Sequence, residues 1–310
     1  MSDQSSDIAL AMSRPLEESD RPQRRTLHLE DGYETGVYVY GRQCAEGREP
    51  VLYAHGIQSH PGWFAGSCAY LARAGHQVFA VCRRGSGDNA RHRGHASSAG
   101  QLLGDVESAC RYVLETTGRS RLGLVGVSWG GKLLASYAAS PLRCVDIASL
   151  VLIAPGIVPQ VDVGLAEKLT IALALLVAPQ RRFDIPLSGV RLFTDNPVMQ
   201  DYLRRDRYAL HRATARFLYA DRQLDGLLRR AGRGAIAAPT TLILARRDRI
   251  VNSAATRRVV ETLTAGQAAV VELDGAHTLE FEADPQPLYE AILAGLGGGG
   301  GDAQAPPGPG

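Results

Sequence analysis

The sequence predicts an α/β fold with a mostly parallel sheet and helices on both of its faces. Three observations lead to this prediction. Short apolar segments alternate with helical patterns, an antiparallel strand pair fits before the alternation begins, and one connection is too long to be a loop. With 310 residues, 45% of them hydrophobic, the chain is long enough to bury one large core.

The first expected element is the antiparallel pair, formed by residues 26–29 and 37–40 around Asp31-Gly32. Six further strands are expected at 51–54, 77–82, 122–127, 150–154, 241–245 and 269–273. Helical patterns lie between or after them, at 63–74, 102–116, 132–139, 254–263 and 287–296. Such alternation is typical of parallel strands joined by right-handed crossovers.

The connection over residues 156–236 follows the sixth expected strand and contains helical patterns at 165–177, 197–204 and 208–228. Open α/β sheets bind ligands beyond the carboxyl ends of their strands, so we expect this insertion to form a helical lid there. The catalytic domain is then expected at 25–155 and 237–296. Residues 1–24 and 297–310 have few apolar side chains and are expected to be disordered tails.

Composition narrows the class of protein. The formal net charge is +2 with acids and arginines interleaved, so no nucleic-acid partner is expected, and arginine pairs such as Arg83-Arg84 are expected mostly on solvated surface. Five cysteines without Cys-x-x-Cys spacing fit a reducing compartment. The polar amino terminus lacks the pattern of a signal peptide, and the prediction is a cytoplasmic protein.

A candidate nucleophile lies in Gly126-Val127-Ser128-Trp129-Gly130, between an apolar strand and a helix. A serine on so sharp a bend needs small neighbours two positions away, because a side chain on Gly126 or Gly130 would collide as the backbone reverses. The alternative is a tight turn whose serine only caps the helix.

A serine needs a base to attack a carbonyl, and the base needs a group that orients it. Asp248 follows the strand expected at 241–245, and His277 follows the strand expected at 269–273. Both are therefore candidates for the same edge of the sheet as Ser128. The alternative for each is an ordinary surface turn.

With this order of Ser, Asp and His, the chain resembles the α/β-hydrolase superfamily over residues 50–296. It looks most like the monoacylglycerol lipase and lysophospholipase branch, also called serine aminopeptidase S33-like. The resemblance is carried by Ser128, Asp248 and His277 together with His55-Gly56-Ile57-Gln58-Ser59-His60, Arg83-Arg84-Gly85-Ser86-Gly87 and the glycines around Ser128.

The resemblance implies an oxyanion hole formed by the backbone N–H groups of Ile57 and Trp129, with supporting roles for His55, Gly56, Gly126 and Gly130. Two departures weaken the substrate assignment. Gln58-Ser59 stand where lipases of this branch commonly have Gly-Glu, and Trp129 stands where they often have Met. A tryptophan here is also common in proline iminopeptidases.

We therefore expect a serine hydrolase that cleaves carboxylic esters, acylglycerol-like, lysophospholipid-like or medium-chain, through an acyl-enzyme on Ser128. No cofactor or metal is expected. The expected partner is a small acyl ester, with transient contact between the lid and a lipid surface; oligomeric state is not predicted. Two alternatives stay open: an aminopeptidase, whose lid would hold a free amine with one of Asp184, Asp195, Asp201 and Asp206, and a non-catalytic small-molecule-binding protein.

Overall fold

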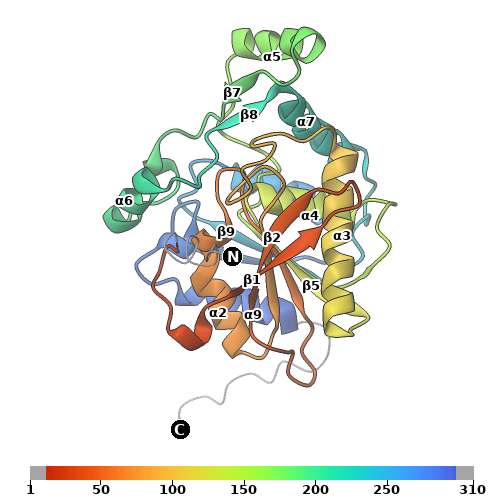
Figure 1. Cartoon of the computed structure of the whole chain (residues 1–310), viewed down its shortest axis with the longest axis vertical. Helices are drawn as coiled ribbons and strands as arrows, with labels where there is room; N and C mark the ends of the chain where they lie inside the picture. Colours follow the sequence, from red (N-terminus) through yellow and green to blue (C-terminus); the bar gives the residue numbers. More distant parts are fainter. Residues whose placement is uncertain (1–11, 298–310) are drawn as a thin grey trace.

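The computed structural model describes residues 12–297 (Figure 1). Their main sheet consists of β1 (Gln23–His28), β2 (Glu34–Tyr40), β3 (Val51–Ala54), β4 (Val78–Val81), β5 (Arg121–Val127), β6 (Asp146–Ile153), β9 (Thr240–Ala245) and β10 (Ala269–Leu273). The strand order is β1-β2-β4-β3-β5-β6-β9-β10. β2 pairs antiparallel with β1 and with β4, and the pairs from β4 to β10 are parallel. The predicted fold class is confirmed.

Helices cover both faces of this sheet (Figure 1). They are α2 (Ala65–Arg73), α3 (Ala99–Thr117), α4 (Trp129–Ala138), α8 (Ser253–Leu263) and α9 (Gln286–Gly297). α2 packs against α9 on one side, and α3 packs against α4 on the other. α3 shows how the sequence sets the limits of a helix, since the Ser98 side chain accepts from Gln101 N–H at its start and Gly118, with φ 64°, ends it.

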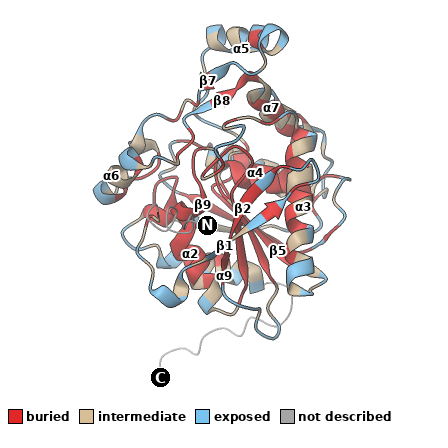
Figure 2. Ribbon diagram, in the orientation of Figure 1, coloured by how far each residue is buried: buried red, intermediate tan, exposed pale blue. Residues whose placement is uncertain are grey.

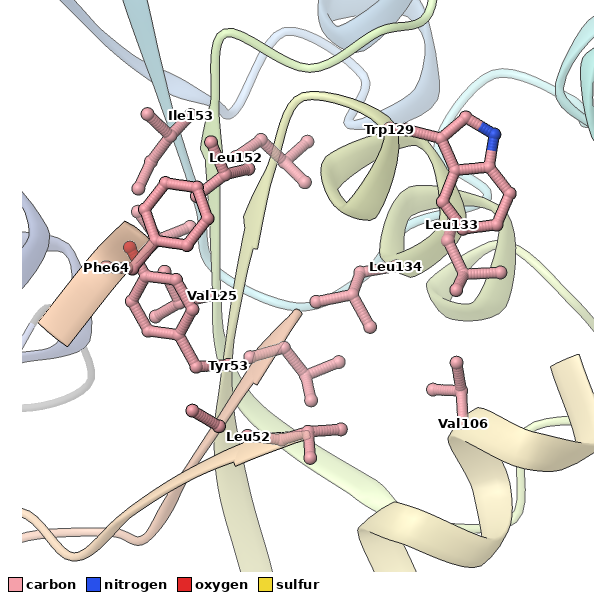
Figure 3. Packing of buried hydrophobic residues seen from close by; sticks show 14 of the residues in the cluster. Leu52, Tyr53, Phe64, Val106, Val125, Trp129, Leu133, Leu134, Leu152 and Ile153 are labelled. Carbon is pink, nitrogen blue, oxygen red and sulfur yellow. The ribbon is translucent and has the colours of Figure 1, made fainter. Parts of the chain in front are cut away.

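The hydrophobic core lies along the central strands, shown in red in Figure 2. β5 and β6 are buried along almost their whole length, as expected for parallel strands covered on both faces. Figure 3 shows Leu134 of α4 and Val106 of α3 turned toward the strand residue Leu52. The central strands are thus held rigidly, and their carboxyl ends form a fixed base for the loops that follow them.

The insertion, residues 156–236, contains α5 (Leu165–Val177), β7 (Arg182–Asp184), α6 (Pro197–Arg205), β8 (Arg212–Thr214) and α7 (Ala215–Arg230), with a short 3-10 helix at Val190–Leu192. α5 agrees with the predicted range and α6 is one residue longer. The helix expected from residue 208 begins only at Ala215, because the Thr214 side chain caps it by accepting from Phe217 N–H. The residues before it pair as β8 with β7, and strands of three residues give too short a pattern to predict.

The amino-terminal segment differs from the expected tail. Ser13 donates through N–H to Gly62 O and through Oγ to Trp63 O, and Arg14 Nη2 donates to the carbonyls of Glu280 and Glu282. β1 then begins at Gln23. Hydrogen bonds from the backbone and side chain of Ser13 and from the side chain of Arg14, together with Leu16 packed against the core, hold this segment in place. The rest of the expected tails, residues 1–11 and 298–310, lies outside the described residues.

Within residues 12–297, no helix has both the length and the apolar character needed to cross a membrane.

Candidate active site

Ser128 lies between β5 and α4 with φ 53° and ψ −121°, a backbone conformation that non-glycine residues rarely adopt. Its glycine neighbours make the turn sterically feasible. A Cβ on Gly126 would lie 2.8 Å from Gly130 O, and a Cβ on Gly130 would meet the carbonyl oxygens of Ala54 and His55. The close approach inferred from the sequence is therefore present, and it presses the turn against the end of β3.

The structure brings Ser128, His277 and Asp248 together. His277 Nε2 is 2.9 Å from Ser128 Oγ, and His277 Nδ1 is 2.8 Å from Asp248 Oδ2. The side chains of His277 and Asp248 are almost completely buried. Asp248 is itself held in place, since its Oδ1 accepts from the N–H groups of Ile250 and Val251 at 2.8 and 2.9 Å. A carboxylate fixed in this way favours the imidazole tautomer with the proton on Nδ1, leaving Nε2 free to accept from the serine.

Trp129 directly follows this serine, Ile57 lies in the loop after β3, and both line the same cavity as Ser128. Within the described part of the chain, neither backbone N–H donates to a protein acceptor. For Trp129 this follows from its position as the first residue of α4, where helix N–H groups have no partner in their own helix. Both groups are thus available to a ligand oxygen.

His55 holds the loop that carries Ile57. Its Nδ1 lies 2.8 Å from Gly56 O, and its Nε2 accepts from Arg83 N–H at 3.0 Å. Burial, with the nearby charge of Arg83, keeps the pKa of His55 well below its usual value. The ring is therefore neutral and carries its proton on Nδ1. Gly56 allows the loop to approach the nucleophile, since a Cβ there would lie 3.3 Å from Ser128 Cβ.

Residues 45–284 match the family described as serine aminopeptidase, S33. The chain belongs to this family. No curated protein sequence matches it significantly.

Several solved structures are similar to this S33 family member. A monoacylglycerol lipase from Paleococcus ferrophilus is 20% identical with TM-score 0.73, and the match covers 86% of this chain and all of that one. A soluble variant of monoglyceride lipase from Saccharomyces cerevisiae, in complex with a substrate analogue, is 16% identical with TM-score 0.75 over 91% and 96% of the two chains. A carboxyl esterase from Bacillus coagulans, in complex with glycerol, is 16% identical with TM-score 0.70 over 88% and 96%. At these identities the similarity concerns the α/β-hydrolase fold.

A cavity of about 530 Å³ lies above Ser128, between the strand ends and the insertion. Its wall is largely apolar. The apolar side chains that the insertion contributes include Val161, Ile171, Leu175, Ile185, Leu187 and Leu218. The insertion is also hydrogen-bonded to the two loops that flank the site, because Leu210 N–H donates to Gln58 O and Thr278 N–H donates to Phe193 O.

A polar cluster at one side of the cavity was not predicted. Lys132, one turn after Ser128, is buried and forms ion pairs with Asp221 and Asp225 of α7. Burial lowers the pKa of Lys132, but the two carboxylates outweigh this effect and raise it. Asp221 also accepts from Trp129 Nε1 at 2.6 Å, and Phe217 stacks on the Trp129 ring. The sequence feature that points to this polar cluster is Lys132 itself, which is one of only two lysines in the chain and lies in an otherwise apolar helix.

The four aspartates proposed as amine ligands in the insertion all have protein partners. Asp184 reaches the cavity and pairs with Arg212, Asp195 pairs with Arg249, and Asp201 pairs with Arg205. Asp206 is buried away from the cavity lining, where it accepts from Trp63 Nε1 at 2.6 Å and lies 3.1 Å from His60 Nε2. Each carboxylate thus already has a cation or a hydrogen-bond donor of the protein as its partner.

Proposed function

We propose that this protein is a serine hydrolase that cleaves carboxylic esters. The observation that carries the proposal is the hydrogen-bonded series Ser128, His277 and Asp248 at the base of an apolar cavity. These residue types in this geometry supply a nucleophile, its base and the group that orients the base. The proposal also has the support of the S33 family match and of lipases and esterases among the similar structures.

In the proposed reaction, Ser128 Oγ attacks the ester carbonyl while His277 Nε2 accepts its proton. The negative oxygen of the tetrahedral intermediate accepts from the N–H groups of Ile57 and Trp129. His277 then returns the proton to the departing alkoxide, which leaves as an alcohol and yields the acyl-enzyme. Water, deprotonated by His277 in the same way, releases the acid and restores Ser128.

The cavity wall favours a medium or long acyl chain. Apolar lining removes the chain from water and stabilises its binding, by about 0.8 kcal/mol for each buried methylene. The aminopeptidase alternative needs a carboxylate directed at a free amine, and the protein partners that Asp184, Asp195, Asp201 and Asp206 already have weigh against it.

The lid proposal includes contact with a lipid surface. α5 exposes an apolar stripe, the α5 leucines, formed by Leu165, Leu169, Leu173 and Leu176. A helix that exposes such a face normally has an interaction partner, and an ester substrate with a long chain would be found in an aggregate or membrane.

The test compares the wild type with Ser128→Ala, using a fluorophosphonate probe and then 4-nitrophenyl esters from acetate to palmitate. Ser136→Ala is the matched control, because Ser136 is a buried serine on α4 that donates to Lys132 O. We expect labelling and ester turnover in the wild type and the control, and neither in Ser128→Ala. Cleavage of proline-7-amido-4-methylcoumarin in preference to the esters would support the aminopeptidase, and absence of both labelling and turnover in the wild type would favour the binding protein.

A further inference from the structure

Arg83 is a buried arginine whose charge has no carboxylate partner among the described residues. It lies in the turn after β4 with 9% of its surface exposed. Its neighbour Arg84 has two partners, Asp105 at 2.7 Å and Asp31 at 2.9 Å. Burial lowers the pKa of Arg83 to about 10, so the group stays charged at neutral pH. Arg83-Arg84 is therefore the exception among arginine pairs that were expected mostly on solvated surface, and a buried cation without a carboxylate partner is costly enough to need a physical reason.

The contacts of Arg83 converge on Ile57. Arg83 Nη2 donates to Ile57 O at 2.8 Å. Arg83 N–H donates to His55 Nε2, which fixes the tautomer in which His55 Nδ1 donates to Gly56 O. The Gly56 carbonyl belongs to the same planar peptide unit as Ile57 N–H. The guanidinium thus holds the peptide unit after Ile57, whereas the backbone N–H of the same residue, which a substitution leaves in place, holds the unit before it through His55.

The same guanidinium contacts the second proposed oxyanion donor. Its central carbon lies 4.8 Å from the centroid of the Trp129 ring and 5.1 Å from that of Phe217. These two rings stack at 5.4 Å, so Arg83 and α7 together fix the ring of Trp129. One side chain therefore touches both residues that are proposed as oxyanion donors.

We propose that Arg83 is a positioning residue for the oxyanion hole, holding the donors of Ile57 and Trp129 in the geometry that the tetrahedral intermediate requires. The role rests on the proposed function, since it needs an oxyanion to form at Ser128. It explains why the cation is retained without a carboxylate. A neighbouring acid would neutralise a positive charge that favours the negative oxygen, and would compete for the guanidinium that orients Ile57.

The experiment measures kcat and KM of Arg83→Met and Arg83→Lys with a 4-nitrophenyl ester, and the inhibition constant of a trifluoromethyl ketone, which forms a tetrahedral adduct on a serine. Arg84→Met is the matched control, because it removes an adjacent buried arginine that contacts neither Ile57 nor Trp129. Thermal unfolding of every variant gives the folded fraction. Arg83→Lys keeps the charge, and it serves as the second variant if Arg83→Met does not fold.

For Arg83→Met we expect kcat to fall on the order of 10- to 100-fold and the inhibition constant of the ketone to rise by a similar factor, with KM almost unchanged. Arg83→Lys should lie between Arg83→Met and the wild type. Arg84→Met should lower the unfolding temperature without selective loss of kcat. Wild-type kcat and ketone affinity per folded molecule in both Arg83 variants would overturn the positioning role alone, whereas a wild type without turnover or labelling would overturn the proposed function and this role with it.

Discussion

His277 Nε2 lies 2.9 Å from Ser128 Oγ although 149 positions of sequence separate the two residues. Ser128 follows β5 and His277 follows β10, and β6 and β9 lie between these strands in the sheet. The loop after β10 must therefore pass over the ends of two strands to reach the serine. Asp248, which follows β9, meets the histidine on that path and fixes its ring.

Asp248→Asn should lower kcat by about 10⁴-fold while leaving the fold intact. The amide can donate to His277 Nδ1, which favours the tautomer with the proton on Nε2, and this nitrogen then cannot accept from Ser128. Steady-state kinetics with a 4-nitrophenyl ester measure the loss. Asp274→Asn is the control, because Asp274 lies just after β10 but is exposed and pairs with Arg247. Equal activity of the two variants would contradict the assignment of Asp248.

Gly130→Ala should lower the free energy of unfolding by about 3 kcal/mol or prevent folding, because its Cβ would collide with the carbonyl oxygens of Ala54 and His55. Neither backbone oxygen can move without distorting the end of β3. Gly104→Ala is the matched change in α3, where an added Cβ meets nothing within 4 Å. It should stabilise the protein by about 0.5–1 kcal/mol. Denaturant unfolding compares the two, and equal stability would contradict the steric account.

Glu280 should make stability fall as pH rises toward neutrality. Burial raises the pKa of Glu280 from 4.5 to about 7, although Ser67 N–H and Tyr289 O–H donate to its Oε1. Between these two pH values the unfolded chain has lost the proton that the folded protein still binds. The free energy of unfolding therefore decreases through this window, by about 3 kcal/mol in all.

The measurement for Glu280 is the pH dependence of unfolding in the wild type and in Glu280→Gln. Glutamine keeps the Oε1 acceptor and does not titrate, so this variant should lack the decrease and should be the more stable protein above neutral pH. Glu290→Gln, at an exposed glutamate of α9, should behave like the wild type. Parallel curves for all three proteins would show that Glu280 does not titrate in this range.

Leu169→Glu combined with Leu173→Glu should weaken binding to phospholipid vesicles on the order of tenfold or more, and should reduce turnover of long-chain esters presented in them. The two side chains are 65% and 61% exposed on α5. Turnover of a dissolved short-chain ester should not change. Leu142→Glu is the control, since Leu142 is also 61% exposed but lies in the loop after α4. A loss common to both substrates would indicate damage to the cavity instead.

The sequence could predict those parts of the molecule that short segments determine by themselves. The limits of β3 and β10 agree with the expected strands, and the sequence pattern alone predicts Ser128, Asp248 and His277 at strand ends. Contacts between distant elements left no such pattern. The stacking of Phe217 on Trp129 and the contact of Asp221 with Lys132 depend on how α7 packs over α4, and the burial of Arg83 depends on the same packing.

The hydrogen bonds from the insertion to the Gln58 and Thr278 loops limit how substrate and product can exchange. If residues 193–210 moved away from the sheet as one piece, they would pull on the loop that contains Ile57 and on the loop that contains His277. The geometry of the site would then be lost at each turnover. α5 is less constrained, since Ala174 is its one fully buried residue, packed against Phe183 and Ala215. We therefore expect passage to and from the cavity to depend on displacement of this single helix, so that the protein opens without losing its catalytic geometry.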